Sequence, residues 1–380
     1  MDIKDFQAGT WRQRYQYKSF YPQKINHEWI ISDPEVNALL AEANRKLGEL
    51  NAFGQLVPDV DFFIRMHVTK EATTSSSIEG TQTTIEEALV KEEDVDPERR
   101  DDWLEVRNYV QAMNGALMQL ERLPLSNRLL RQTHKLLLSS GRGKSKQPGE
   151  FRSSQNWIGP ALKGAVFVPP THEEVPDLMS DLELFLHNEK LLVPHLIKIA
   201  IAHYQFETVH PFLDGNGRLG RLMITLYLVS TKLLEKPTLY LSAYFEKHRR
   251  FYYDYLTAAR TKNDLTEWIK FMLSGVIETS QSSIETFREI LALRERIERH
   301  VITQLGKRVP RAQQLVEQLY TQPFMTAADV QRMLNVSPAT ANALIAEFVR
   351  LGILRERTGF KRNRIYAFDE YLAIFRSKES

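Results

Sequence analysis

Residues 210–221 read His-Pro-Phe-Leu-Asp-Gly-Asn-Gly-Arg-Leu-Gly-Arg. They separate two apolar segments, residues 193–206 and 222–234, whose patterns predict buried helices of a bundle. Gly215 and Gly217 let the backbone approach a ligand closely. A glycine-rich turn that leads into a helix also directs free N–H groups and the positive helix end at an anion. The stretch therefore predicts an anion-binding loop between two core helices.

The charged residues of this loop indicate which anion it binds. Arg218 and Arg221 are three residues apart on one helical face, where two guanidiniums can grip successive phosphates. Asp214 supplies a hard oxygen ligand of the kind that Mg²⁺ takes alongside substrate phosphates. His210 titrates near neutrality, which suits a base that deprotonates a hydroxyl. Each feature alone is typical of an ordinary turn, but together they predict a polyphosphate site beside a general base.

The twelve residues resemble the motif of the Fic family, His-Pro-Phe-x-Asp/Glu-Gly-Asn-Gly-Arg-x-x-Arg, with every specified position present. P-loops and dinucleotide-binding loops lack the leading histidine and the paired arginines. The resemblance implies an all-α core that transfers AMP from ATP to a Ser, Thr or Tyr hydroxyl of a target protein and releases pyrophosphate. It implies that His210 is the catalytic base, that Phe212 anchors the loop and that Asp214 holds Mg²⁺. The nucleotide-binding residues that it implies are Asp214, Gly215, Asn216, Gly217, Arg218, Leu219, Gly220, Arg221 and Tyr252.

Two positions downstream concern the nucleotide base. Tyr252 and Tyr253 lie where many relatives carry a tyrosine pair near the adenine, although aromatic residues on a helix fit a core equally well. Arg260 stands where some relatives have an asparagine that contacts adenine. The purine preference therefore stays open.

A short apolar run precedes the loop. It consists of Ala165, Val166, Phe167 and Val168, between Gly-Pro and Pro-Pro pairs. The run is long enough for a strand and too short for a helix, so it predicts a β-hairpin. Together with residues 151–152 and 156–159 it resembles the flap of the Fic family, which implies pairing with the backbone of the target protein. A plain surface hairpin is the alternative.

Residues 73–84 are rich in hydroxyl side chains, which by composition predicts a loop or a helix cap. Residues 75–80 resemble the Ser/Thr-x-x-x-Glu-Gly/Asn inhibitory motif of many Fic proteins, which implies that Glu79 is an inhibitory glutamate. The spacing of four places Ser75 and Glu79 on one helical face, with the hydroxyl securing the helix. We expect Glu79 to form a bidentate pair with Arg221 and so to compete with the γ-phosphate of ATP.

The last part of the chain has a different pattern. Residues 315–368 predict two helices, a turn, a third helix and a hairpin whose first strand begins at residues 352–354, an order that resembles a winged helix-turn-helix. The basic residues around this hairpin are Arg350, Arg355, Arg357, Lys361, Arg362 and Arg364. Only Glu356 opposes them, so the wing predicts contact with DNA phosphates. Docking to protein or dimerisation is the alternative.

The length of 380 residues favours two or three domains in a mostly α-helical protein. The predicted division is residues 1–102, an N-terminal helical region with the inhibitory motif; 103–285, the Fic catalytic core with its β-hairpin flap; 286–310, a helical linker; and 311–380, the winged helix-turn-helix. A hydrophobic content of 43% and a charged content of 26% are typical of a folded chain.

Composition also excludes several classes of protein. The chain has no cysteine, which excludes disulfides, thiolate zinc sites, iron–sulfur clusters and a cysteine nucleophile. No apolar run approaches the roughly 20 residues of a membrane span, so we expect a cytoplasmic protein that does not contact membranes. The formal charge of +2 gives no global attraction to nucleic acid.

These features predict a protein adenylyltransferase that uses ATP and Mg²⁺ and is autoinhibited by Glu79. Its expected partner is a protein with an exposed hydroxyl residue; self-modification, a second copy in a homodimer and DNA are the further partners considered. One alternative is a Fic-type hydrolase that removes AMP, in which Glu79 positions a water. Another is a DNA-binding regulator whose core senses a nucleotide, but sensing requires no base and His210 is present.

Overall fold

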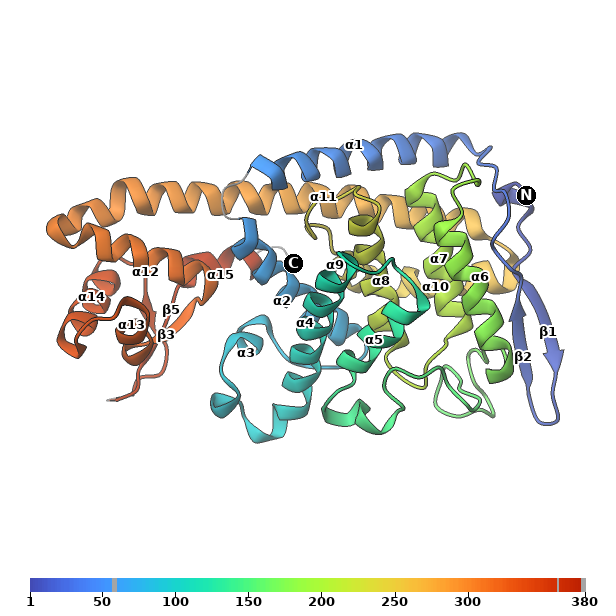
Figure 1. The fold of residues 1–380 in the computed structure, drawn as a ribbon, viewed down its shortest axis with the longest axis horizontal. Helices are drawn as coiled ribbons and strands as arrows, with labels where there is room; N and C mark the ends of the chain where they lie inside the picture. Colours follow the sequence, from blue (N-terminus) through green and yellow to red (C-terminus); the bar gives the residue numbers. More distant parts are fainter. Residues whose placement is uncertain (57–59, 361, 377–380) are drawn as a thin grey trace.

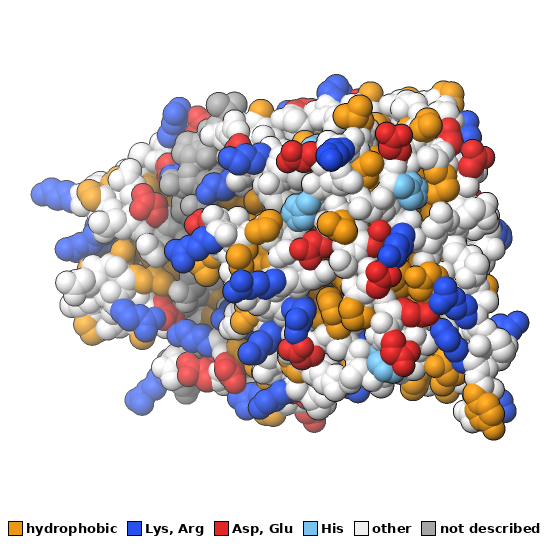
Figure 2. Space-filling view, turned by 45° about the vertical axis from the view of Figure 1, so that its right-hand side comes forward, with side chains coloured by type: hydrophobic (Ala, Val, Ile, Leu, Met, Phe, Trp, Pro, Cys, Tyr) orange, Lys and Arg blue, Asp and Glu red, His pale blue; other side chains and the backbone are white. Residues whose placement is uncertain are grey.

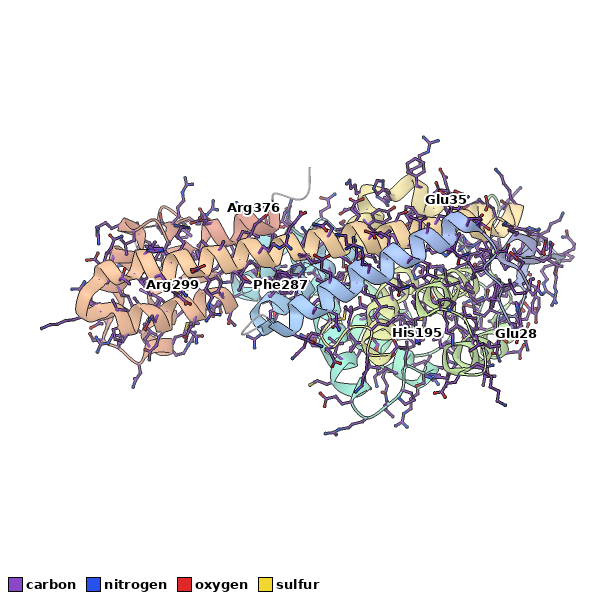
Figure 3. All side chains as sticks on the ribbon, turned by 90° about the horizontal axis from the view of Figure 1, so that it is seen from above. Glu28, Glu35, His195, Phe287, Arg299 and Arg376 are labelled. Carbon is purple, nitrogen blue, oxygen red and sulfur yellow. The ribbon has the colours of Figure 1, made fainter. Side chains whose placement is uncertain are left out.

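The longest helix, α11 (Leu265–Arg296), runs through both halves of the molecule in this computed structural model (Figure 1). The structure describes residues 1–56, 60–360 and 362–376. Helix α1 (Pro34–Leu56) lies along α11, as the view from above shows (Figure 3). Lys270 of α11 donates to Glu35 at the start of α1 over 2.5 Å. This helix pair is the spine against which the other helices pack.

The chain is mostly helical, as predicted. The other helices are α2 (Val60–Ile78), α3 (Ile85–Leu89), α4 (Arg100–Leu120), α5 (Asn127–Leu137), α6 (Val175–His187), α7 (His195–Val209), α8 (Asn216–Ser230), α9 (Ser242–Lys247), α10 (Arg249–Lys262), α12 (Val309–Thr321), α13 (Ala327–Leu334), α14 (Pro338–Arg350) and α15 (Asp369–Arg376). The strands are β1 (Gly9–Gln13), β2 (Lys18–Pro22), β3 (Phe324–Thr326), β4 (Arg355–Glu356) and β5 (Ile365–Ala367). They form one two-stranded sheet and one three-stranded sheet, both antiparallel.

Helices α7 and α8 form the centre of the core and correspond to the two apolar segments predicted as buried helices. Residues 196–209 of α7 are all buried. The Trp268 indole of α11 donates to the Ala200 carbonyl over 2.8 Å, and His203 bonds the Gly220 carbonyl over 3.0 Å. Because Nδ1 of His203 donates to this carbonyl, its Nε2 accepts from the Tyr252 hydroxyl. These bonds join α7, α8, α10 and α11 into one unit.

Helix α2 lies between this core and the C-terminal part of the chain. On its core side, Glu71 accepts from the Tyr109 hydroxyl over 3.0 Å and from the Ser242 hydroxyl over 2.5 Å. On its other side, Lys70 donates to the Phe375 carbonyl of α15 over 2.9 Å. At its end, Arg249 donates to the Ile78 carbonyl over 2.7 Å. The position of the residues that follow α2 is therefore set from three directions.

The N-terminal hairpin was not predicted, because the first hundred residues had indicated helices. Strand β1 pairs with β2 from Gly9 opposite Pro22 to Gln13 opposite Lys18. The Phe20 N–H donates to the Val168 carbonyl over 2.9 Å. The hairpin thus covers the segment that was predicted to be the flap.

The predicted helices and hairpin of the C-terminal unit occur in the expected order, as α12, α13, α14, β4 and β5. Strand β3 and helix α15 were not predicted, and the sheet has the order β3-β5-β4. The expected strand start at residues 352–354 is wrong. Gly352 adopts a left-handed conformation with φ of 74°, and the N–H groups of Ile353 and Leu354 bond the Phe348 carbonyl, so these residues form the turn that ends α14. The strand β4 begins only at Arg355.

All three predicted boundaries lie inside helices. Residue 102 belongs to α4, residue 285 to α11 and residue 310 to α12, so a continuous helix carries the chain across each position. Figure 2 shows acidic and basic side chains interspersed over one face of the molecule, in keeping with the balanced composition. Among the described residues no helix combines the length and the apolar character of a membrane span.

The buried carboxyl of Glu71 should make stability depend on pH. Burial raises its pKa from the usual 4.5 to about 7. A carboxyl with a raised folded-state pKa stabilises the fold below its unfolded pKa and loses that contribution as the pH rises through the folded pKa. We expect the free energy of unfolding to fall between pH 5 and pH 8, with Glu71 contributing up to about 3 kcal/mol.

The substitution Glu71→Gln should remove about half of this pH dependence, since burial raises the pKa of Glu207 to about 7 as well. Denaturant unfolding at several pH values measures the slope. The exposed Glu93→Gln is the matched control and should leave the slope unchanged. An undiminished slope in Glu71→Gln would contradict the assignment.

Candidate active site

The loop between α7 and α8 begins with a strained histidine. His210 caps α7 in the left-handed region with φ of 49°, which is uncommon for a residue with a side chain. Arg152 Nε donates to its carbonyl over 3.0 Å, and Asn156 Nδ2 donates to the same carbonyl over 3.0 Å. Asn156 Nδ2 also donates to the Phe212 carbonyl over 2.9 Å. These donors stabilise a backbone conformation that would otherwise cost free energy.

Arg152 and Asn156 are functional residues that the sequence analysis missed. It quoted both as part of the flap, but their side chains hold the loop instead. Arg152 is almost fully buried and also donates to the carbonyls of Val209 and Pro170. Burial lowers its pKa to about 10. No sequence signal could have found these contacts, because the two residues precede the loop by 54 positions or more.

The rest of the loop is closed by side chains packed beneath it. Asn216 accepts from the Phe212 N–H over 2.9 Å and donates to the Phe212 carbonyl over 2.8 Å. The Phe212 ring is fully buried and stacks on His134 at 3.8 Å. His134 accepts from the Gly149 N–H, so its other nitrogen donates to the Asp214 carbonyl over 3.0 Å. Burial lowers the pKa of His134 to about 4, which keeps this neutral tautomer at neutral pH.

The side chain of Glu79 lies against the glycine turn. A Cβ atom at Gly217 would overlap Glu79 Oε1 and come within 3.0 Å of Arg221 Nη1. Glycine is therefore required at this position for the carboxylate to sit over the start of α8. The carboxylate occupies the place beside Arg221 and the helix N-terminus that the sequence analysis assigned to an anion.

Arg221 is the centre of this cluster. Its guanidinium is 1% exposed and its Nη2 lies 2.8 Å from Glu79 Oε1. The predicted contact between Glu79 and Arg221 is confirmed, but the expected bidentate geometry is wrong. Two further hydrogen bonds go to Ser75, whose Oγ accepts from Nε over 2.9 Å and whose carbonyl accepts from Nη2 over 2.8 Å. Ser75 thus contacts the arginine directly instead of only securing its helix.

Electrostatics favour the ionised form of this pair. Burial alone would raise the pKa of Glu79, but Arg221 outweighs it and holds that pKa below its usual value. Glu79 remains 36% exposed, so it is not the buried carboxylate that pairing with a buried arginine would suggest. It lies past the last residue of α2 and is followed by Gly80, whose φ is 100°.

Arg218 is held by a partner that the sequence analysis did not identify. Its Nη1 donates to Glu105 Oε2 of α4 over 3.1 Å, and Nη2 lies 3.6 Å from Asp214 Oδ1. Arg142 donates to the other oxygen of Glu105 over 2.8 Å. Arg142 also pairs with Asp102 over 2.6 Å, so the two arginines are held among the carboxylates of Glu105, Asp102 and Asp214.

The imidazole of His210 is neutral at neutral pH. Burial lowers its pKa to about 4, and the cations Arg260 and Arg152 act in the same direction. Its Nδ1 lies 3.9 Å from Glu207 Oε2. Burial raises the pKa of Glu207 to about 7, so that carboxyl titrates near neutrality within reach of the imidazole.

The predicted flap is not a regular hairpin. Ile158 and Phe167 form one isolated antiparallel bridge, with the Val166 N–H donating to the Ile158 carbonyl over 2.8 Å. Phe167 and Val168 are buried, whereas Val166 is 73% exposed and Ala165 is partly exposed. The strand prediction is wrong because the Val168 carbonyl bonds to β2 and the Phe167 ring packs under Arg260, at 4.3 Å.

Three of the predicted nucleotide contacts face the core instead of the loop. Tyr252 is 1% exposed and its hydroxyl bonds His203. Leu219 is fully buried, and a Cβ at Gly220 would meet the Glu207 carboxylate. Tyr253 is 41% exposed and is the member of the tyrosine pair open to a ligand. Sequence spacing alone could not tell which side of α8 or of α10 faces the core and which faces the loop.

Asp214 fits the expected metal. Its side chain is 42% exposed, and its Oδ1 accepts from the Gly215 N–H over 2.6 Å. In the part of the chain that the structure describes, no group of three or more His, Cys, Asp or Glu forms a cage for an ion. A single carboxylate that relies on phosphate and water oxygens for the remaining ligands is the arrangement that Mg²⁺ commonly takes.

Comparison with known proteins gives two family matches. Residues 37–118 match the family described as Fic/DOC family N-terminal, and residues 124–228 match the Fic/DOC family. The protein adenylyltransferase Fic of Aedes aegypti is 34% identical over 125 residues, which cover 33% of this chain and 22% of that protein. A probable protein adenylyltransferase of Aquifex aeolicus is 44% identical over 71 residues, 19% of this chain and 22% of that protein. The chain thus spans about a fifth of the length of these relatives.

Solved structures show the same fold. A Fic family protein from Desulfovibrio desulfuricans superposes with a TM-score of 0.57 at 23% identity, covering 90% of this chain and 98% of that one. Fic-1 of Caenorhabditis elegans superposes with a TM-score of 0.52 at 22% identity, covering 69% of this chain and 75% of that one.

The forked guanidinium of Arg152 should be required for the loop to form. In Arg152→Lys, one ammonium cannot reach carbonyls on both sides of the fork, and buried acceptors are left unpaired. We expect a loss of about 2–4 kcal/mol in the free energy of unfolding, measured by denaturant titration. Arg131→Lys, at a side chain that is 42% exposed, is the control. A loss below about 0.5 kcal/mol for Arg152→Lys would show that the loop does not depend on it.

Proposed function

The chain belongs to the Fic/DOC family by the N-terminal and Fic domains that it carries, and from this we propose that it is a protein adenylyltransferase. It would transfer AMP from ATP to a hydroxyl side chain of a target protein. The observation that carries the proposal is the loop at the start of α8, where a neutral imidazole and two buried guanidiniums meet a glycine turn. The match to the Fic/DOC family spans residues 124–228 and so includes this segment, and the relatives described above are named protein adenylyltransferases.

In this proposal His210 is the catalytic base. A neutral imidazole is the form that can accept a proton. Because Nδ1 faces Glu207, Nε2 is left for the target hydroxyl. The hydroxyl oxygen attacks the α-phosphorus, its proton passes to His210, and the bond to the β-phosphate breaks so that pyrophosphate leaves. Glu207 would stabilise the imidazolium that forms.

The helix start and the two arginines would bind the phosphates. Arg221 and Arg218 supply forked donors, and the N–H groups that follow Gly215 are free at the first turn of α8. Mg²⁺ bound at Asp214 would neutralise phosphate charge when it is present. Val166, at the exposed edge of the flap segment, would contact the target backbone.

Glu79 would inhibit the enzyme by taking the Arg221 donor that a γ-phosphate needs. Two observations support this: Arg221 Nη2 lies 2.8 Å from Glu79 Oε1, and the Glu79 carboxylate lies so close to Gly217 that any side chain there would overlap it. A nucleotide bound beside Glu79 would be displaced, and a misplacement of about 1 Å can cost on the order of 10²-fold in rate. A hydrolase that uses Glu79 to position water would instead release AMP from modified protein.

The first test removes the base. His210→Ala should bind ATP nearly as well as the wild type and lose AMP transfer by about 10²-fold or more, the scale of a general base. Incorporation of labelled AMP into the protein or into lysate proteins measures the rate. His172→Ala, at an exposed histidine, is the control. Transfer at the wild-type rate in His210→Ala would refute the catalytic assignment.

The second test separates competition at Arg221 from loosening of α2. Glu79→Gly should raise AMP incorporation strongly because the Arg221 donor becomes free for phosphate. Glu79→Gly combined with Arg221→Ala should not show the increase, because the guanidinium that removal of Glu79 makes available to the phosphate is then missing. If the single variant is no faster than the wild type, Glu79 does not inhibit. If it gains AMP removal instead of transfer, the hydrolase alternative holds.

We also propose that the C-terminal wing contacts DNA phosphates. Among the described residues Arg355 and Arg362 are exposed and form no ion pair, whereas Arg357 pairs with Asp369 and Arg350 with Glu347. Lys361, also named in the sequence analysis, lies outside the described residues.

Replacing both Arg355 and Arg362 with Glu should weaken DNA binding and reduce the salt slope by about 2. Titration of a labelled duplex at several salt concentrations measures this, with Arg299→Glu as the control. If the wild type does not bind at low salt, the wing has another partner.

A further inference from the structure

A cavity lies at the end of α7 that is remote from His210. It has a volume of about 720 Å³, within the usual range of small-molecule sites. Its walls come from the ends of α4, α6 and α8, from the start of α7 and from the loops between them. Helix α7 has 15 residues, so the cavity is about 20 Å from the candidate active site.

One buried cation lines this cavity. Lys198 is 5% exposed, and its ammonium donates to the Asn188 carbonyl over 3.2 Å and lies 5.7 Å from the centre of the Phe185 ring. Among the described residues no carboxylate lies within 4.0 Å of it. Glu189 is the one acidic residue of the lining and is exposed. Glu189 acts on Lys198 electrostatically from beyond ion-pair distance. Burial of the ammonium is thus only partly compensated, and a bound anion would offset the remaining cost.

The start of α7 favours an anion at the same place. Pro194 caps the helix without a side-chain acceptor, so the first N–H groups of α7 have no capping partner. The helix dipole adds partial positive charge beside Lys198. His195, the first residue of α7 and labelled in Figure 3, bonds the Tyr227 hydroxyl over 2.8 Å. The exposed guanidinium of Arg122 is a further cation on the wall.

The rest of the lining combines polar side chains, among them Ser230 and Thr231, with an aliphatic group. That group includes Leu120, Leu123, Leu125, Leu186, Leu191 and Val193. Leu192 at the rim is 94% exposed. An inorganic anion would leave these side chains unused, and a neutral hydrocarbon would leave Lys198 unpaired.

We propose that this cavity binds a small amphipathic anion, an aliphatic chain that ends in a carboxylate or a phosphate monoester. The acid group would lie between the Lys198 ammonium and the start of α7, and the chain would lie along the leucines. Nothing in this inference depends on the proposed transfer of AMP, because the cavity shares no lining residue with the candidate active site.

Calorimetric titration of the 380-residue chain tests the site with four probes: octanoate, octyl phosphate, 1-octanol and inorganic phosphate. We expect the better of the two octyl acids to bind with a Kd below about 1 mM and at least about tenfold more tightly than octanol or inorganic phosphate. Whether octanoate or octyl phosphate is preferred identifies the head group. If neither acid binds up to about 5 mM, or octanol binds as tightly as the better acid, the proposal is overturned. Equal binding of inorganic phosphate and octyl phosphate would also overturn it.

Substitutions locate the binding. Lys198→Met keeps the length of the side chain and removes its charge, and should weaken the better acid by about tenfold or more. Lys190→Met, at an exposed lysine of the same loop that does not line the cavity, is the matched control and should stay within about twofold. Equal affinity in Lys198→Met and in the wild type would contradict the placement. Lys198→Arg retains the charge and supplies a folded comparison if Lys198→Met fails to fold.

Discussion

A buried guanidinium must have acceptors, and that requirement at Arg221 organises the structure around the candidate site. Arg221 lies in the first turns of α8 with its side chain 1% exposed, and its acceptors are Ser75 of α2 and Glu79 just beyond the end of that helix. Helix α2 therefore has to lie where it does, and the bonds of Glu71 and Arg249 hold it there. Without these contacts, burying the Arg221 guanidinium would destabilise the packing of α7 against α8.

The same loop shows how a polar site is made rigid within an apolar bundle. The left-handed His210 and the turn at Asp214 expose carbonyls in the core, and each is met by a buried donor from a distant part of the chain, Arg152, Asn156 or His134. Burial then lowers the pKa of His210 and of His134. Both imidazoles stay neutral at neutral pH as a consequence of packing, with no carboxylate needed to set their state.

The sequence allowed the helical class, the two core helices, the loop between them and the contact of Glu79 with Arg221 to be predicted, because glycines, charges and apolar periodicity lie within short stretches. It did not allow the faces of α8 and α10 to be told apart, so Tyr252 was assigned to a ligand although it lies in the core. Nor could it show that Glu105 holds Arg218, since the two residues are 113 positions apart. The regular hairpin expected at residues 165–168 does not form for a similar reason: the Val168 carbonyl bonds to an N-terminal strand that the local pattern did not indicate.

The two acceptors of Arg221 differ in how freely they can move away from it. Ser75 lies within α2 and bonds the guanidinium through both its hydroxyl and its carbonyl, so it cannot depart unless the helix moves. Glu79 lies beyond the last helical residue, is 36% exposed and is followed by Gly80 with φ of 100° and open space around it. A phosphate could therefore replace the Glu79 carboxylate by rotation of one side chain, while Ser75 keeps the guanidinium in place. Exchange of one anion for another at a positioned arginine would then require neither unfolding of α2 nor movement of the C-terminal unit that packs against it.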